Sequence, residues 1–434
     1  MRAFYNLLFT IGFLLSAPFY FLKMWRRGNW QSGFGQRFGN YSGKLKQRLT
    51  NRNIIWFHAV SVGEVNICTQ LIQMLELRAP NLKIVVSTTT STGMGELQRK
   101  LPQHIEKIYY PIDRHKAVRR ALAVINPIVI VLIEAEIWPN FLWHANERRI
   151  PLLLVNARLS DRSYRGYKRF GFLFRPIFQT FAGVGCQNET DAARLREIGF
   201  RPEAVHTFGN LKFDAAALND RRLLNVPALL AQLGVKKGAP ILVAGSTHAG
   251  EEAILAEIFL RLREKFPDLF LVMVPRHFER GKEVGRELET RGVKFIYRSV
   301  ITAETRHSPG EIDCLLVNST GELKYFYEHA TVIFVGKSLT AEGGQSPIEP
   351  GALGKAMVFG PNMQNFAVIA EAFVKKDGAV QVIDAVELEK TISDLLADEN
   401  RRTALGKNAL QVVRENLGAI DKTVEMILAA LPKN

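Results

Sequence analysis

Short apolar runs alternate with amphipathic stretches from about residue 52 onward. In the first half of the chain, strand-like runs occupy residues 54–58, 83–87, 128–133 and 152–156. Between them, residues 64–77 and 117–125 carry apolar side chains at helical spacing. This alternation of strands and helices predicts a parallel sheet that is covered by helices on both faces.

The same alternation returns in the second half after it weakens over residues 210–238. The later strand-like runs are residues 241–245, 270–274, 314–317, 332–335 and 356–359. We therefore expect an α/β protein with two Rossmann-like domains, residues 31–222 and 223–405, that face each other across a cleft. Residues 401–431 are helical in pattern, and we expect the stretch 406–434 to pack back on the N-terminal domain.

Residues 1–30 predict a membrane anchor. Residues 4–22 are almost unbroken apolar sequence, and about 20 helical residues match the roughly 30 Å of a bilayer's hydrocarbon layer. A secretory signal peptide is the alternative. Only Arg2 precedes the run, whereas Lys23, Arg26 and Arg27 follow it. This charge bias favours an uncleaved anchor with the following domains in the cytoplasm. Whether the helix crosses the bilayer or lies in one leaflet stays open.

Composition narrows the possible partners. Of the 434 residues, 57 are Lys or Arg and 42 are Asp or Glu, which gives a net charge of +15. The surplus favours nucleic acid, an acidic membrane surface or a phosphorylated substrate, although a solvated basic surface fits equally well. Cys68, Cys186 and Cys314 lie far apart and form no C-x-x-C pair. Neither a disulfide framework nor a zinc site is therefore indicated.

Two strand ends of the first domain and the segment 209–214 that closes it carry candidate catalytic groups. Glu64 follows the first strand at the start of a helix, where it is either a general base or a carboxylate that complements the helix dipole. Taken alone, the motif favours the dipole role. Glu134 and Glu136 follow another strand, and on an extended chain they would point to the same side. No histidine lies near them in the sequence, so a transition-state role is favoured over a metal pair. Lys212 either pairs with Asp214 or balances developing negative charge.

In the second domain, successive strand ends suit a nucleotide. The turns are residues 245–248, 274–277, 318–323 and 336–349. Small and hydroxyl residues in such turns suit an anion at a helix start. Arg276 is placed to clamp a phosphate or stack on a base, and Glu349 to accept both hydroxyls of a ribose. The sequence contains neither a P-loop nor a G-x-G-x-x-G fingerprint.

Residues 156–176 mix six cations with five aromatic side chains. Nucleic-acid binding is one interpretation. Beside a membrane anchor, contact with anionic lipid is the favoured one.

The order and wording of these motifs resemble the bacterial 3-deoxy-D-manno-octulosonic acid (Kdo) transferases of lipid A biosynthesis. The matching runs are HAVSVGE at 58–64, EAEIWPN at 134–140, NARLSDRS at 156–163, GNLKFD at 209–214, STHAGEE at 246–252, VPRHFER at 274–280, TGEL at 320–323 and GGQSPIE at 343–349. They cover nearly the whole chain after the anchor, in the family's order.

The resemblance implies a GT-B fold on the cytoplasmic face of a bacterial inner membrane. It also implies inverting, metal-independent transfer of Kdo from CMP-Kdo to the 6′-hydroxyl of a lipid A precursor, with no cofactor and no nucleic-acid partner. By position, Glu64 matches the family's general base, and Glu134 and Lys212 match residues of transition-state stabilisation. The positions that match the CMP-binding segments are Pro275, Arg276, Thr320, Gly321, Glu322, Ser346, Pro347, Ile348 and Glu349.

Some positions depart from the family's pattern. Ser346 stands where the family usually has Asn, Thr320 where it usually has Met, and Lys337 where it usually has Gly. Two alternative functions are carried forward. One is another GT-B enzyme that uses a UDP-sugar donor, and the other is a membrane-tethered basic protein that binds nucleic acid.

Overall fold

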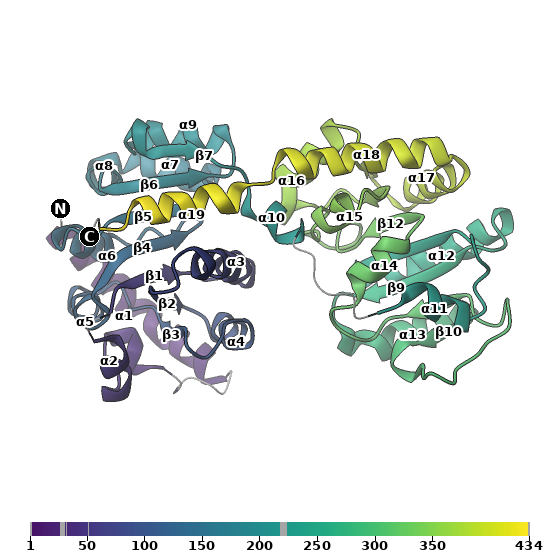
Figure 1. Ribbon diagram of the computed structural model, residues 1–434, viewed down its shortest axis with the longest axis horizontal. Coiled ribbons are helices and arrows are strands. Elements are labelled where there is room, and N and C mark those ends of the chain that lie inside the picture. The colour runs from purple at the N-terminus through teal and green to yellow at the C-terminus, as the bar shows by residue number, and fades with distance from the viewer. Residues whose placement is uncertain (1, 27–30, 32, 51, 218–223, 433–434) are drawn as a thin grey trace. The chain divides into compact units, whose positions relative to one another are not determined.

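The computed structural model describes residues 2–26, 31, 33–50, 52–217 and 224–432 (Figure 1). The chain divides into two compact units. Unit 1 consists of Met1–Ala215 and Leu417–Asn434, and unit 2 consists of Ala216–Asn416. The predicted domain boundary after residue 222 lies outside the described residues, as does Arg27 of the predicted anchor.

Unit 1 is built on a sheet of seven strands in the order β3-β2-β1-β4-β5-β6-β7, in which every pairing is parallel. The strands are β1 (Ile54–His58), β2 (Lys83–Thr88), β3 (Glu106–Tyr109), β4 (Pro127–Ile133), β5 (Leu152–Ala157), β6 (Phe181–Cys186) and β7 (Val205–Thr207). Because all neighbours are parallel, the strands end at one edge, which we call the carboxyl edge of the unit 1 sheet.

Helices cover both faces of this sheet. The helices of unit 1 are α1 (Arg2–Arg26), α2 (Gly43–Leu49), α3 (Val62–Arg78), α4 (Ser91–Lys100), α5 (His115–Ile125), α6 (Pro139–Glu147), α7 (Asp161–Arg169), α8 (Gly171–Phe178), α9 (Glu189–Ile198), α10 (Leu211–Ala217) and α19 (Ala419–Ala429). Strand β1 has all five residues buried. Trp56 packs on the side of α5 and α6, whereas Ile55 and Phe57 pack on the side of α3 and α4. A strand buried on both faces explains its unbroken apolar sequence.

Helix α19 returns to unit 1 from the end of the chain (Figure 1). Ala419, Ile420, Val424 and Ile427 join the apolar cluster that includes α3. The expectation of a single helical stretch over residues 401–431 is wrong. The chain leaves the helical conformation at Gly418, where φ is 88°, and this turn separates α18 (Glu399–Glu415) from α19.

Unit 2 repeats the architecture with a seven-stranded parallel sheet in the order β10-β11-β9-β8-β12-β13-β14. The strands are β8 (Ile241–Thr247), β9 (Phe270–Pro275), β10 (Phe295–Tyr297), β11 (Cys314–Leu316), β12 (Val332–Val335), β13 (Met357–Phe359) and β14 (Val380–Gln381). The helices besides α18 are α11 (Val226–Gln232), α12 (Glu251–Lys265), α13 (Gly281–Thr290), α14 (Leu323–His329), α15 (Ile348–Ala352), α16 (Ala367–Lys375) and α17 (Ala385–Ala397). The prediction of two α/β domains with parallel sheets is confirmed.

The predicted anchor forms the single helix α1, which contains Pro18. Its window Arg2–Phe19 has the length and composition of a membrane-crossing helix, and none of that window is buried in the protein. The cysteines Cys68, Cys186 and Cys314 are free and buried, as expected of small core residues.

Candidate active site

The carboxyl edge of the unit 1 sheet carries the three residues that the sequence singles out for catalysis. Glu64 lies in the first turn of α3, directly after β1. Glu134 follows the last residue of β4, and Lys212 lies in the first turn of α10, after β7. Three separate crossovers therefore bring these side chains to one edge of one sheet.

Glu64 caps the helix on which it sits. The Ser61 hydroxyl accepts the Glu64 N–H at 3.2 Å, and the Glu64 carboxylate accepts the N–H groups of Val60 at 2.8 Å and Ser61 at 3.4 Å. This reciprocal capping box satisfies donors that every helix start leaves open. Within its own helix, Glu64 therefore acts as the carboxylate at the helix start that the motif alone favours. A carboxylate has about four lone-pair sites, so two backbone bonds leave capacity for a further donor.

The surroundings of Glu64 raise the pKa of its carboxyl group. The residue is only 7% exposed. Burial raises the pKa of Glu64, the hydrogen bonds from Val60 and Ser61 oppose this, and the negative charges of Glu134 and Glu136 raise it further. A carboxyl whose pKa moves toward neutrality is better matched to proton abstraction than an ordinary surface glutamate.

Glu134 does not lie on an extended chain, so the geometric reason for expecting Glu134 and Glu136 to point to the same side does not hold. Glu134 has a left-handed backbone, with φ 62°, and turns the chain directly after β4. Its Oε1 lies 3.9 Å from Lys212 Nζ. Asp214, the other candidate partner of Lys212, instead accepts the N–H groups of Gly418 at 2.7 Å and Ile420 at 3.1 Å.

Sequence reasoning missed a buried group around His58. The ring of His58 stacks on Tyr110, with centroids 3.8 Å apart, and its Nδ1 lies 3.0 Å from both oxygens of Ser87. Its buried Nε2 has no hydrogen-bond partner within the described part of the chain and lies 3.8 Å from Glu136 Oε2. The only signal in the sequence is a histidine that ends an otherwise apolar strand.

The pKa of Glu136 is shifted in the opposite direction to that of Glu64. Trp138 Nε1 donates to Glu136 Oε2 at 2.8 Å. Burial would raise the pKa of Glu136, but its interactions with His58 and Trp138 outweigh burial and lower the pKa. Two neighbouring carboxyl groups with pKa values displaced in opposite directions are a common arrangement in sites of acid–base chemistry.

A network of amide side chains fixes the loop that carries Lys212. Asn156, with φ 53° in the last part of β5, accepts the N–H of Leu211 at 3.1 Å through Oδ1. Gln187 donates to the Asn156 carbonyl at 3.0 Å, and Asn210 donates to Gln187 at 3.0 Å. Among the residues that the structure describes, no group of three or more His, Cys, Asp or Glu side chains has the arrangement of a metal site.

In unit 2, one buried carboxylate joins two of the predicted turns. Glu251, at the start of α12, is fully buried and accepts four backbone N–H groups. The donors are His248 at 2.8 Å, Lys337 at 2.7 Å, Ser338 at 2.8 Å and Leu339 at 2.9 Å. These N–H groups are occupied, so the interpretation of the 245–248 turn as an anion cradle is wrong for the His248 N–H.

The turns after β8 and β12 approach each other closely. A Cβ added to Gly336 would lie 2.6 Å from the carbonyl oxygen of Ser246, so only glycine fits. Both turns use left-handed residues, Ser246 with φ 56° and Lys337 with φ 55°.

The predicted nucleotide-binding residues lie at the same carboxyl edge of the unit 2 sheet. Arg276 is exposed, and its N–H donates to the Thr247 carbonyl at 2.9 Å. The pKa of Glu349 is raised. Desolvation by the surrounding protein is the largest cause, and the positive charges of Lys324 and Arg276 partly oppose it. The side chain keeps access to solvent. The ends of β9 and the start of α15 therefore bring Arg276 and Glu349 within electrostatic range of each other.

The remaining predicted positions differ in what they offer a ligand. Glu322 accepts a hydrogen bond from Arg298 at 3.0 Å and another from the Ser319 hydroxyl. Gly321 has a left-handed backbone, with φ 84°, and Thr320 is exposed. Pro275, Pro347 and Ile348 are buried, whereas Ser346 is partly exposed. Buried side chains of this kind leave only their backbone to a ligand.

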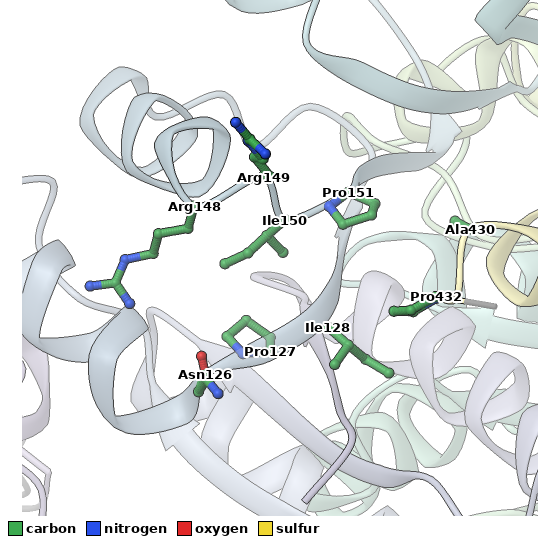
Figure 2. Close-up of a pocket in the computed structure, with 9 residues that line it drawn as sticks. All are labelled: Asn126, Pro127, Ile128, Arg148, Arg149, Ile150, Pro151, Ala430 and Pro432. Carbon is green, nitrogen blue, oxygen red and sulfur yellow. The ribbon is translucent and has the colours of Figure 1, made fainter. Parts of the chain in front are cut away.

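A pocket of about 470 Å³ lies elsewhere (Figure 2). It is lined by Pro127 and Ile128 at the amino end of β4, by Pro151 just before β5, and by Pro432 near the chain end. This position is the edge of the unit 1 sheet opposite Glu64 and Glu134. In open α/β sheets ligands bind beyond the carboxyl ends of the strands, so this pocket lies at the edge where a substrate is not expected.

Two parallel-sheet α/β domains with polar and charged residues at the carboxyl edge of each sheet are the architecture of the GT-B fold. A solved UDP-GlcNAc 2-epimerase from Neisseria meningitidis has this fold, with a TM-score of 0.58 at 13% identity, over 87% of this chain and 100% of that chain. The family profile described as 3-deoxy-D-manno-octulosonic-acid transferase (kdotransferase) matches residues 32–215.

Full-length relatives carry the same name. A 3-deoxy-D-manno-octulosonic acid transferase of Haemophilus influenzae is 31% identical over 88% of this chain and 88% of its own. One of Bordetella pertussis is 31% identical over 96% of this chain and 98% of its own. The chain belongs to the Kdo transferase family and is a glycosyltransferase.

Proposed function

We propose that this enzyme transfers Kdo from CMP-Kdo to the 6′-hydroxyl of a lipid A precursor (lipid IVA), with inversion at the anomeric carbon and without a metal ion. Unit 1 binds the acceptor, and unit 2 binds the donor. The observation that carries the proposal is the carboxyl edge of the unit 1 sheet, where burial and two neighbouring carboxylates raise the pKa of Glu64.

Glu64 acts as the general base in a single displacement. It takes the proton of the 6′-hydroxyl while that oxygen forms a bond to the anomeric carbon of Kdo. The bond from this carbon to the phosphate oxygen breaks at the same time, and its electron pair leaves with CMP. One base on the face opposite the leaving group is what an inverting substitution at a sugar requires.

Glu134 and Lys212 stabilise the transition state as a pair. Lys212 Nζ lies 3.9 Å from Glu134 Oε1, and the positive charge of the ammonium group stabilises the negative charge that develops during transfer. The left-handed backbone of Glu134 and the amide network around Asn156 hold the two side chains in place before substrate arrives.

The donor is recognised in unit 2 by residues that suit a monophosphate and a ribose. Arg276 binds the CMP phosphate, a charge-assisted contact that also stabilises the departing phosphate monoester. Glu349 accepts hydrogen bonds from the ribose hydroxyls. The turn of Thr320, Gly321 and Glu322 and the segment of Ser346, Pro347 and Ile348 complete the CMP site through side-chain and backbone contacts.

The enzyme works at the cytoplasmic face of the bacterial inner membrane, where helix α1 attaches it to anionic lipid. The apolar sequence of α1 and the positive charge that follows it support this placement. Phe170 and Phe172, at 47% and 60% exposure, give the basic segment 156–176 apolar side chains that reach solvent, as a lipid-binding surface requires.

The test is a product analysis with purified full-length protein. Incubation with CMP-Kdo and lipid IVA should release CMP and give an acceptor whose mass has increased by Kdo. An acceptor that lacks the 6′-hydroxyl should remain unchanged, since it has no nucleophile at that position. Turnover of a UDP-sugar in place of CMP-Kdo, or Kdo transfer to the acceptor without the 6′-hydroxyl, would contradict the proposal.

A further inference from the structure

The amino-terminal turns of helix α1 are bonded to unit 1. Tyr5 donates to Asp113 Oδ2 at 2.7 Å. The amides of Asn6 and Asn140 exchange two hydrogen bonds, at 2.8 and 3.3 Å. Arg2 pairs with Glu147, about two helix turns further along α6. The first turns of the apolar helix therefore contact the same globular unit that the chain enters after its last turn.

Asp113 shows that this contact is part of the folded unit. Only 2% of the residue is exposed, and its carboxylate also accepts the N–H groups of Asn140 at 3.0 Å and Phe141 at 2.8 Å. Removal of the Tyr5 hydroxyl would leave a buried carboxylate without one of its hydrogen-bond donors.

On a helix at the surface of a soluble protein, the polar face points outward. On α1 the apolar face points outward and the polar face points toward unit 1. Its polar residues Asn6, Thr10 and Ser16 lie on the half-buried face toward unit 1. The large apolar side chains with more than two-fifths of their surface exposed are Phe4, Leu7, Leu8, Ile11, Leu14, Leu15, Phe19, Phe21, Leu22 and Trp25. They recur at intervals of three and four residues over the helix, so one continuous apolar stripe faces away from the protein.

Cations lie beside this helix. A cavity of about 380 Å³ is lined by Asn6 and Thr10 of α1 and by Arg114, Lys116 and Arg120 at the start of α5. The three cations are exposed. Positive charge next to an apolar stripe matches the boundary between anionic headgroups and acyl chains.

We propose that α1 lies in the plane of one membrane leaflet, with its apolar stripe in the acyl region and both of its ends on the cytoplasmic side. A helix of 25 residues is about 37 Å long. If it crossed the bilayer, Arg2, Tyr5 and Asn6 would be separated from Glu147, Asp113 and Asn140 by the hydrocarbon layer. The contacts of the first turns and a transmembrane arrangement exclude each other. The inference rests on the proposed membrane attachment and names its geometry.

The depth of the outward stripe tests this geometry. Leu8→Cys, Leu15→Cys and Leu22→Cys place a thiol at intervals of seven residues on the exposed face, and the native cysteines are buried. Each full-length variant is labelled with a fluorophore in anionic vesicles and quenched by lipids that carry the quencher at known depths. An in-plane helix puts all three labels at one shallow depth, about 5–10 Å below the headgroups. A spanning helix separates successive labels by about 10 Å along the bilayer normal.

Sidedness provides the second measurement. Ala3→Cys introduces an exposed thiol at the start of α1, and Lys44→Cys on α2 provides the matched control within unit 1. Both variants are expressed in cells, from which inverted membrane vesicles and intact spheroplasts are prepared. A membrane-impermeant maleimide should label both thiols in the inverted vesicles and neither thiol in the spheroplasts. Labelling of Ala3→Cys alone in spheroplasts would overturn the in-plane arrangement while membrane attachment stands. Membrane attachment itself would be overturned if the protein does not bind anionic vesicles. This holds whether the unbound protein is a monomer or a dimer formed through the apolar stripe.

Discussion

Lys337 adopts a left-handed backbone directly after β12, with φ 55°. Its N–H donates to the buried carboxylate of Glu251 at 2.7 Å, so the conformation is fixed by a bond that joins two strand ends. The left-handed region costs a residue with a Cβ about 1–2 kcal/mol. This cost explains why the family usually has glycine at this position, where this chain has lysine.

Substitution at Lys337 should therefore follow backbone preference. Lys337→Gly is expected to be more stable than Lys337→Ala by about 1 kcal/mol, because only glycine enters this conformation without strain. The measurement is the urea midpoint of unfolding for both variants. An alanine variant that equals or exceeds the glycine variant would show that the backbone at this position is not strained.

At the scale of elements, one carboxylate contributes to the attachment of α19 to unit 1. Asp214 in α10 accepts the N–H groups of Gly418 and Ile420 at the start of α19. It thus caps a helix about 200 residues away in the sequence. The apolar face of α19 then packs against α3. A local sequence pattern cannot predict this cap, because Asp214 and the start of α19 come together only in the folded protein.

Removal of that cap should loosen α19. Asp214→Ala is expected to cost about 1 kcal/mol and to speed proteolytic cleavage near the Gly418 turn. Asp421→Ala provides the control, since Asp421 forms an exposed pair with Arg78, and such pairs contribute between about 0 and 1 kcal/mol. Equal cleavage rates for the two variants would mean that Asp214 does not hold the helix.

The sequence predicts most central strands and misses several others for identifiable reasons. β1 and β12 have the predicted bounds, because buried parallel strands read as continuous apolar runs. β6 was missed because Gly183 and Gly185 weaken its pattern. A Cβ at Gly183 would meet the sulfur of Met426 at 2.8 Å, so the glycine makes room for α19. β14, at the edge of the unit 2 sheet, has only two residues and leaves no periodicity to detect.

At the scale of the whole molecule, Glu64 and Glu134 could be placed at a sheet edge from the order of strands and helices alone, whereas Lys212 could not, because the strand before it, β7, is not predicted. The pKa shifts of the carboxyl groups at this edge could not be predicted from the sequence. The raised pKa of Glu64 and the lowered pKa of Glu136 depend on burial and on neighbours from other crossovers, His58 among them. Likewise, the sequence shows an apolar helix α1, but only the contacts of its first turns with unit 1 decide how it meets the membrane.

The central claim is that the Glu64 carboxylate removes the proton of the acceptor hydroxyl. Glu64→Gln is a sharp test, because glutamine keeps the capping box but cannot take the proton. Ser61→Ala weakens the same cap, at a cost of about 1 kcal/mol, and leaves the carboxylate in place.

The measurement is the initial rate of Kdo transfer from CMP-Kdo to lipid IVA by the wild-type protein and both variants, with CMP affinity determined alongside. The account predicts that Glu64→Gln lowers the rate by roughly 100-fold or more, that Ser61→Ala stays within a few-fold of wild type, and that all three bind CMP alike. A Glu64→Gln enzyme that transfers Kdo at the wild-type rate would contradict it.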